Sequence, residues 1–294
     1  PATAGYFLRD EPSADDFAEL GAWAARIRAT DDAHYCYLNL FPNYAPCETL
    51  KTDSYREYVN RFDREVPLQL LSFDHYPVVG DTCRPEWYEN LEIFSDEARK
   101  AGKPFWAFAL ATAHEPYPIP DLAQLRLQVY SDLAYGAQGI QYFTYWTPEK
   151  NPTWDFHHAP VERSSGRRTD VYDKIKQMNA EIRALSGVFL GCEVVSVRHT
   201  GESIPRGTVR LTELPDGVKK LETTGAGAVV SELRNGNNRF IVIVNRDFKN
   251  PMTLQIELDE TASRILKDGS VVPASLYHET MVVEPGDAMI YMLE

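Results

Sequence analysis

The chain has 294 residues, of which 44% are hydrophobic, and it carries a formal net charge of −13 at pH 7. This composition is typical of a globular protein, and the acidic balance argues against nucleic acid as a partner, because binding a phosphate backbone needs a basic face. No apolar run approaches the roughly 20 residues that a membrane span requires, so we expect no such span.

Five strand-like segments in the first 187 residues are each followed by a helix-like segment. The strands are predicted at 5–10, 34–41, 68–76, 104–111 and 139–146. The helices are predicted at 14–29, 54–65, 86–101, 121–135 and 171–185. The strands are nearly continuous apolar runs, as expected when helices cover both faces of a parallel sheet. Five βα units in succession therefore predict an α/β fold with right-handed crossovers.

The loops that follow these strands carry the unusual residues, whereas the loops that precede them are short and plain. That asymmetry is typical of a (β/α)8 TIM barrel, whose chemistry lies at the C-terminal ends of its strands. Only five of the eight units are present. Either an N-terminal barrel half is missing from this sequence, or another chain closes the sheet, or the sheet stays open. We expect the first, so that residues 1–187 form the C-terminal part of a TIM-barrel-like domain.

From residue 188 the pattern changes to short β-rich segments. They are separated by turn signals such as LPDG and NGNN, and no long helical segment interrupts them. We therefore expect a second domain at 188–294, an all-β sandwich of about eight strands.

The four cysteines are too few for a disulfide scaffold and have no CxxC spacing, so a zinc cluster is not expected. Cys36 and Cys192 lie in strand-like runs and are expected to be buried thiols. Cys47 and Cys83 fall in consecutive loops that follow two strands. If those loops are neighbours, a disulfide can join them, which would suit an exported protein, periplasmic or extracellular.

Carboxylates and aromatic residues gather at the predicted strand ends. Glu11 follows the first strand, Asp74 and Tyr76 end the third, and Glu115 lies beyond the fourth. The fifth strand and its loop contribute Trp146, Trp154, Asp155 and His158. In a barrel these positions converge on one cleft. Aromatic rings beside carboxylates suit a sugar, because rings stack on its C–H faces while acids bond its hydroxyls and transfer protons.

Several of these residues also have plainer interpretations. Glu11 can be an acid that only precedes a helix, and Glu115 can be a solvated loop acid. The histidines lack the spacing of a helical zinc motif, so we expect no metal and no cofactor. The four that could gather a metal are His75, His114, His157 and His158.

Three stretches, RDEP, FDHYP and YFTYWTPEKNPTWDFHHAP, resemble glycoside hydrolases of the (β/α)8-barrel clan, especially the β-galactosidase family 42. The resemblance implies that Glu11 is the general acid/base and that Asp74 and Tyr76 line the cleft. It also implies sugar binding by Trp146, Asp155 and His158. Asp10 stands where the family has an asparagine that contacts the sugar.

The family's nucleophilic glutamate is expected about five residues after Pro104, where this chain has Ala109. Glu115 is then the first candidate for the second carboxyl and Asp74 the second. Retaining enzymes need carboxyl groups about 5–5.5 Å apart and inverting ones about 6.5–9.5 Å.

The sequence therefore predicts a glycoside hydrolase acting on an oligo- or polysaccharide. The alternative is a carbohydrate-binding pseudo-enzyme that has lost its nucleophile. A weaker alternative is a metal-dependent hydrolase that uses the histidines.

Overall fold

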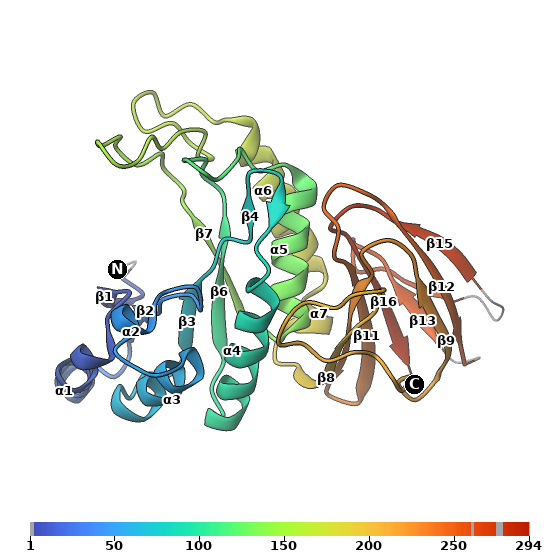
Figure 1. The fold of residues 1–294 in the computed structure, drawn as a ribbon, viewed down its shortest axis with the longest axis horizontal. Helices are drawn as coiled ribbons and strands as arrows, with labels where there is room; N and C mark the ends of the chain where they lie inside the picture. The colour runs from blue at the N-terminus through green and yellow to red at the C-terminus, as the bar shows by residue number, and fades with distance from the viewer. Residues whose placement is uncertain (1–2, 260–261, 275–278, 294) are drawn as a thin grey trace.

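The computed structural model describes residues 3–259, 262–274 and 279–293. A parallel sheet with its helices lies beside a pair of antiparallel sheets, and the helix α5 lies between the two parts (Figure 1). No helix in the described ranges combines the length and the apolar character needed to cross a membrane.

Five parallel strands form the first part. They are β1 (Gly5–Asp10), β2 (Tyr35–Asn39), β3 (Leu71–Asp74), β6 (Phe105–Leu110) and β7 (Gly139–Phe143). β1 pairs with β2, and β3, β6 and β7 pair in that order, all in parallel. A parallel bridge between Leu40 and Phe73 connects β2 to β3, so the strands follow one another in chain order.

A helix follows each of these strands, as the sequence predicts. The five helices are α1 (Phe17–Thr30), α3 (Tyr55–Glu65), α4 (Trp87–Ala101), α5 (Leu122–Ala134) and α6 (Asp170–Ala184). Shorter elements in the connections are a 3₁₀ turn (Ala14–Asp16), α2 (Cys47–Leu50), α7 (Ser186–Phe189), β4 (Val78–Val79) and β5 (Thr82–Cys83). The strands predicted at 68–76 and 139–146 are shorter in the structure, ending at Asp74 and Phe143.

Local sequence signals fix where several helices begin and end. The Ser54 side chain accepts a hydrogen bond from the Glu57 N–H at the start of α3. At the start of α5, Asp121 and Gln124 form a reciprocal capping box. Gly102 ends α4 in the left-handed conformation, with φ of 63°, which glycine adopts without strain.

One face of the parallel sheet is lined with aromatic side chains. Tyr37 packs against Phe7 with ring centroids 5.5 Å apart and against Trp106 at 6.2 Å. A Cβ atom at Gly139 would lie 2.6 Å from the Trp106 ring, so glycine is required for this close approach. Phe7 is 61% exposed and Tyr35 is 48% exposed. Among the described strands, β1 and β7 pair on one side only, so the sheet has two open edges.

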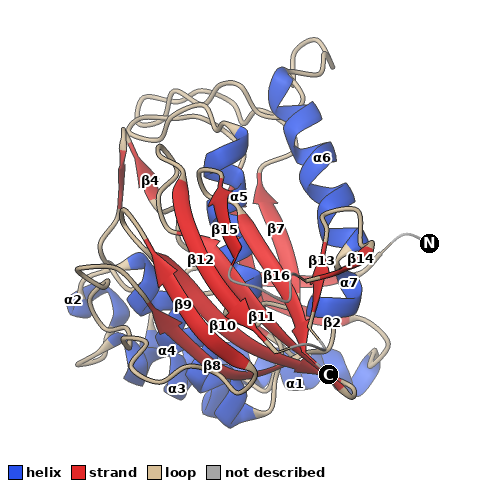
Figure 2. Ribbon diagram, turned by 90° about the vertical axis from the view of Figure 1, so that its right-hand side faces the viewer, coloured by secondary structure: helices blue, strands red, loops and turns tan. Residues whose placement is uncertain are grey.

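The strands described after α7 are antiparallel and form two sheets. One sheet has six strands in the order β14-β13-β16-β11-β10-β8, and a three-stranded sheet has the order β15-β12-β9. The strands are β8 (Glu193–His199), β9 (Val218–Thr223), β10 (Ala228–Asn235), β11 (Asn238–Asn245), β12 (Met252–Leu258), β13 (Ser263–Ile265), β14 (Val271–Pro273), β15 (Glu279–Val283) and β16 (Ala288–Leu293). The two sheets face each other across a shared apolar core that includes Ile241 and Leu254 (Figure 2).

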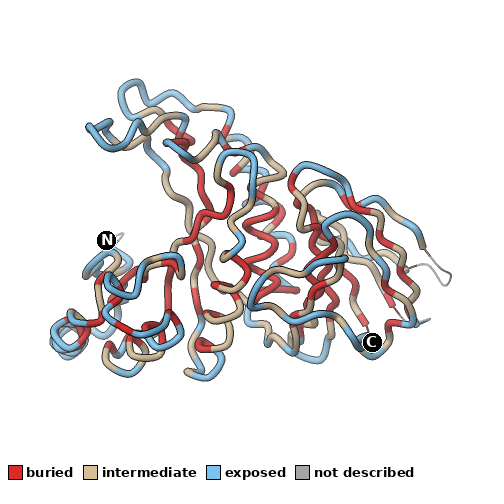
Figure 3. Tube along the Cα trace, viewed as in Figure 1, coloured by how far each residue is buried: buried red, intermediate tan, exposed pale blue. Residues whose placement is uncertain are grey.

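The six-stranded sheet packs its other face on α5. One hydrophobic core runs from the parallel sheet through α5 to β10 and β11, and the buried stretches of these elements face one another (Figure 3). The Ser231 hydroxyl of β10 donates to the Ala134 carbonyl of α5 at 2.6 Å. The antiparallel part is therefore joined to the parallel part by packing and by a buried hydrogen bond.

All four cysteines are free thiols, so the disulfide considered between Cys47 and Cys83 does not form. Cys47 is exposed in α2, where its thiol lies 3.5 Å from the Asp53 carbonyl. Cys83 lies on the β4–β5 hairpin and packs against the main core, and burial raises the pKa of its thiol to about 12. Export therefore stays a prediction without this support.

Candidate active site

Glu11 is held firmly at the end of β1. Its backbone N–H donates to the Asn39 carbonyl at 2.9 Å, and the next carbonyl, that of Pro12, accepts from the buried Tyr58 hydroxyl at 2.6 Å. Glu11 has a left-handed backbone with φ of 44°. For a non-glycine residue this conformation costs about 1–3 kcal/mol and persists only where the surroundings fix it.

Glu11 plays no part in starting the following helix. Ser13 is the N-cap there, and Asp16 completes the capping box by accepting from the Ser13 N–H and hydroxyl. Asp15 and Asp16 are the acids of the first turn. The plainer interpretation of Glu11 as a helix-start acid is therefore wrong for this position.

A cluster of carboxyl groups surrounds the end of β2. Asp74 at the end of β3 accepts a hydrogen bond from the Asn39 amide at 2.6 Å, and Asp10 of β1 accepts from the same amide nitrogen at 3.5 Å. A β-bulge between Phe7 and Arg9 brings Asp10 opposite Asn39. Asp10, Glu11 and Asp74, called the carboxyl cluster below, thus come from the ends of β1 and β3, which lie on either side of β2.

The environment separates the proton affinities of Glu11 and Asp74. Burial, followed by the charges of Asp74 and Asp10, raises the pKa of Glu11 from its usual 4.5 to about 8. Burial raises the pKa of Asp74 to about 6, while the hydrogen bond from Asn39 opposes that rise. At neutral pH this difference favours the proton on Glu11 over Asp74.

Tyrosines and one arginine form a wall beside the carboxyl cluster. Burial, followed by the neighbouring charge of Asp74, raises the pKa of Tyr76. The Arg84 guanidinium lies 4.4 Å from the centre of the Tyr44 ring and bonds the Tyr117 hydroxyl at 3.1 Å. Sequence reasoning did not single out Tyr44, Arg84 or Tyr117, although each lies on a loop that follows a strand.

Glu115 belongs to a different group. Its side chain is exposed, and its backbone N–H donates to the Asp155 carboxylate at 2.9 Å. That bond lowers the pKa of Asp155, which is also exposed. Of the two candidates for the second carboxyl, the structure places Asp74 beside Glu11 and Glu115 beside Asp155.

The aromatic residues of the last loop differ in how they connect to the cluster. Tyr76 contacts Tyr117, which packs against His114 at a tilt, and the His114 and Trp154 ring centroids lie 5.5 Å apart. Trp154 is therefore joined to the cluster by a row of rings. Trp146 is exposed and packs on Tyr145 instead.

His158 lies beside His157, with their Nδ1 atoms 2.8 Å apart, and both line a hollow of about 570 Å³ within the loop. His75 is buried against the edge of Tyr44, and burial lowers its pKa to about 3. Within the described residues no three His, Cys, Asp or Glu side chains are grouped so that they could hold a metal ion.

Ala109 points away from the carboxyl cluster. It is fully buried and pairs in register with Tyr142, whose hydroxyl donates to Asn179 of α6, so both lie on the face that packs against helices. Leu110, paired with Phe143, occupies the opposite face at the end of β6. The strand end thus presents a leucine where a carboxylate would be expected.

Comparisons with known proteins place this site in context. The family described as beta-galactosidase, glycoside hydrolase family 42, matches residues 34–185, and the curated proteins contain no match. Among solved structures, the chain is similar to a β-galactosidase from the psychrophilic Marinomonas ef1, with 14% identity and a TM-score of 0.45 over 59% of this chain and 27% of that one.

It is also similar to an α-L-arabinofuranosidase from Thermotoga petrophila RKU-1, with 11% identity and a TM-score of 0.44 over 96% of this chain and 62% of that one. An α-amylase from Geobacillus thermoleovorans gives 11% identity and a TM-score of 0.48 over 96% and 57%. The chain thus spans only part of each of these enzymes. The family match covers more than half of the chain, which therefore belongs to glycoside hydrolase family 42.

Proposed function

We propose that the protein hydrolyses a glycosidic bond of an oligo- or polysaccharide, with Glu11 as the general acid and Asp74 as the second carboxyl. The observation that carries this proposal is that Glu11 and Asp74 lie together at the ends of β1 and β3, where burial raises the pKa of Glu11 further than that of Asp74. Two carboxyl groups whose environments push their pKa values apart are suited to acid catalysis at neutral pH.

The chemistry assigns a separate task to each group. Glu11 donates its proton to the oxygen that leaves the sugar, because it still holds that proton at pH 7. The Asp74 carboxylate stabilises the positive charge that develops on the sugar ring in the transition state. Trp154 and Tyr76 offer ring faces along the route to the cluster, and Asp155, Trp146 and His158 extend the sugar site along the loop.

Turnover of a panel of glycosides tests this assignment. Glu11→Gln is expected to abolish cleavage of alkyl glycosides and to spare activated aryl glycosides more, because a good leaving group needs less help from an acid. Asp74→Asn is expected to slow both classes. Glu115→Gln also removes one carboxyl, but outside the cluster, and serves as the matched control.

The second candidate is a carbohydrate-binding pseudo-enzyme, favoured by the absence of a carboxylate at Ala109 and Leu110. Saturable sugar binding by the complete protein with no turnover of any glycoside would establish it and would refute hydrolysis.

We further propose that residues 1–187 are the C-terminal part of a TIM barrel, that residues 188–294 form a β-sandwich packed on it, and that an N-terminal barrel half or another chain completes the barrel. The open edges of β1 and β7 and the exposed aromatic face support this.

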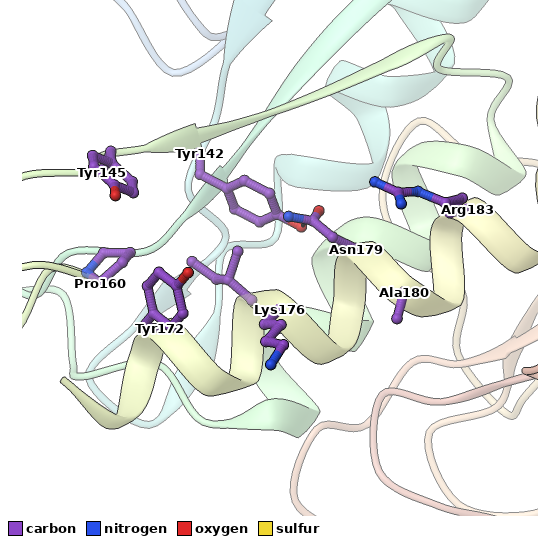
Figure 4. A pocket seen from close by; sticks show the side chains of 9 residues that line it. Tyr142, Tyr145, Pro160, Tyr172, Lys176, Asn179, Ala180 and Arg183 are labelled. Carbon is purple, nitrogen blue, oxygen red and sulfur yellow. Dashed lines mark hydrogen bonds between the residues drawn. The ribbon is translucent and has the colours of Figure 1, made fainter. Parts of the chain in front are cut away.

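Beside β7 lies a groove of about 630 Å³, where Tyr142 points toward Asn179 and Tyr172 extends from α6 (Figure 4). Further parallel units would cover this groove and the aromatic face.

A further inference from the structure

Asn39 is the centre of a hydrogen-bond network that ends on the carboxyl cluster. Its amide nitrogen donates to Asp74 at 2.6 Å, and its amide oxygen accepts from the Ser72 hydroxyl at 2.9 Å. Ser72 in turn bonds Tyr37 at 2.9 Å and receives a hydrogen bond from the Gln141 amide at 3.0 Å. Because β6 lies between β3 and β7, the bond from Gln141 to Ser72 crosses over β6 on one face of the sheet.

The direction of the hydrogen bonds in this network is fixed from its far end. The Gln141 amide nitrogen can only donate, so the Ser72 oxygen accepts there and its single proton is free to go to Asn39. Tyr37 then donates to Ser72 as well. With its oxygen occupied by Ser72, the Asn39 side chain must turn its amide nitrogen toward Asp74. The network thus holds a donor against one carboxyl of the pair.

We propose that Asn39 is the positioning residue that keeps Asp74 ionised and so leaves the shared proton on Glu11. A hydrogen bond donated to a carboxylate stabilises its charged form, and two adjacent carboxylates do not both ionise readily. The proton therefore resides on the carboxyl without such a donor. This inference rests on the proposed role of Glu11 as the acid, and it names the group that assigns the proton to Glu11.

The Tyr76 hydroxyl also bonds Asp74 and lowers the pKa of that carboxyl, by less than Asn39 does. The titratable groups facing the pair therefore add less to this selection than Asn39. They are Asp10 from β1 and the tyrosines Tyr37, Tyr44, Tyr55, Tyr58 and Tyr76. Burial is the main cause that raises the pKa of each of these tyrosines, so they stay neutral. Asp10 carries a like charge that raises the pKa of both Glu11 and Asp74, so it does not favour one over the other.

Carbon-13 NMR of the side-chain carboxyls in the complete protein tests the inference without using activity. Glu11→Gln and Asp74→Asn identify the two signals. In Asn39→Ala, at pH 7, we expect the Glu11 signal to move toward the ionised position and the Asp74 signal toward the protonated one. Because the two pKa values lie about two units apart, losing a bond worth about one pKa unit would move about a tenth of the proton occupancy from Glu11 to Asp74.

Asn245→Ala is the matched control, because Asn245 is an equally buried asparagine whose amide bonds three backbone carbonyls in the antiparallel part. It is expected to lower stability and to leave both carboxyl signals in place. If Asn39→Ala does not fold, Ser72→Ala replaces it, because this change frees the Asn39 amide to rotate. It is expected to move the Glu11 signal toward the ionised position and the Asp74 signal toward the protonated one.

Unchanged signals in a folded Asn39→Ala or Ser72→Ala variant would overturn the inference, as would equal changes in Asn245→Ala. The proposed function fails separately, through the absence of glycoside turnover in the wild-type protein. The NMR result decides the role of Asn39 in either case.

Discussion

Glu11→Gln should make the protein more stable at pH 8 and leave its stability at pH 4 unchanged. Glutamine imitates the protonated carboxyl at every pH, whereas Glu11 has a pKa raised from 4.5 to about 8 in the folded state. A carboxyl whose pKa is raised in the folded state contributes its full stabilisation at pH values below the pKa that it has in the unfolded chain. That contribution is lost as the pH rises from about 4.5 through about 8.

The size of the effect follows from the same pKa. A rise from 4.5 to about 8 corresponds to about 5 kcal/mol if the group were wholly buried. Glu11 is partly exposed, so solvent screening reduces this, and we expect about 2 kcal/mol. Urea unfolding of both proteins at pH 4, 6 and 8 measures the difference in the free energy of unfolding.

The difference should grow steadily over this range. Glu115→Gln removes an exposed carboxyl and controls for the lost charge alone. A Glu11→Gln effect that is the same at pH 4 and pH 8, or a wild type that gains on the variant as the pH rises, would refute the assignment of the proton to Glu11.

Three further predictions concern the rest of the structure. Asp132 is buried with one carboxylate oxygen unbonded among the described atoms, and burial raises its pKa. Asp132→Asn should therefore raise the free energy of unfolding at pH 8 by about 1–3 kcal/mol in urea titrations, and a loss of stability would contradict this. Ser231→Ala breaks the bond to Ala134 and should cost about 1 kcal/mol, seen as a lower melting temperature, and an unchanged melting temperature would be against it. Phe7→Ser should change the free energy of unfolding of residues 1–294 by less than about 0.5 kcal/mol, because Phe7 is exposed. In a protein with a completed barrel the same change should cost at least about 2 kcal/mol. Equal costs in the two proteins would argue against barrel completion.

The sequence was sufficient for features that depend on local patterns. Apolar runs followed by capped amphipathic segments predicted the alternation of strands and helices, and the carboxylate after the first strand directed attention to Glu11. The cysteine expectation failed because it depended on which loops are neighbours. Cys83 follows a hairpin into the core, while Cys47 remains on the surface.

Features that depend on strand register could not be predicted. Asn39 is one polar residue in an apolar run, and its importance arises from the pairing that brings Asp10 and Asp74 to its amide. Counting residues from Pro104 identified Ala109, but only the register with Tyr142 shows that its side chain faces the helices. Glu115 was favoured by its place in the sequence, and the path of its loop carries it to Asp155.

The position of α5 limits how this protein can be divided. Residues on different sides of the helix are buried, including Leu125, Leu127 and Tyr130, and a helix buried all round needs cover on every side. The parallel sheet covers one side and the antiparallel sheet the other. A chain truncated near residue 187 would therefore expose apolar side chains of α5 to water and would aggregate. The antiparallel part is therefore a structural support of the parallel part, and exchanging it between relatives would require exchanging α5 with it.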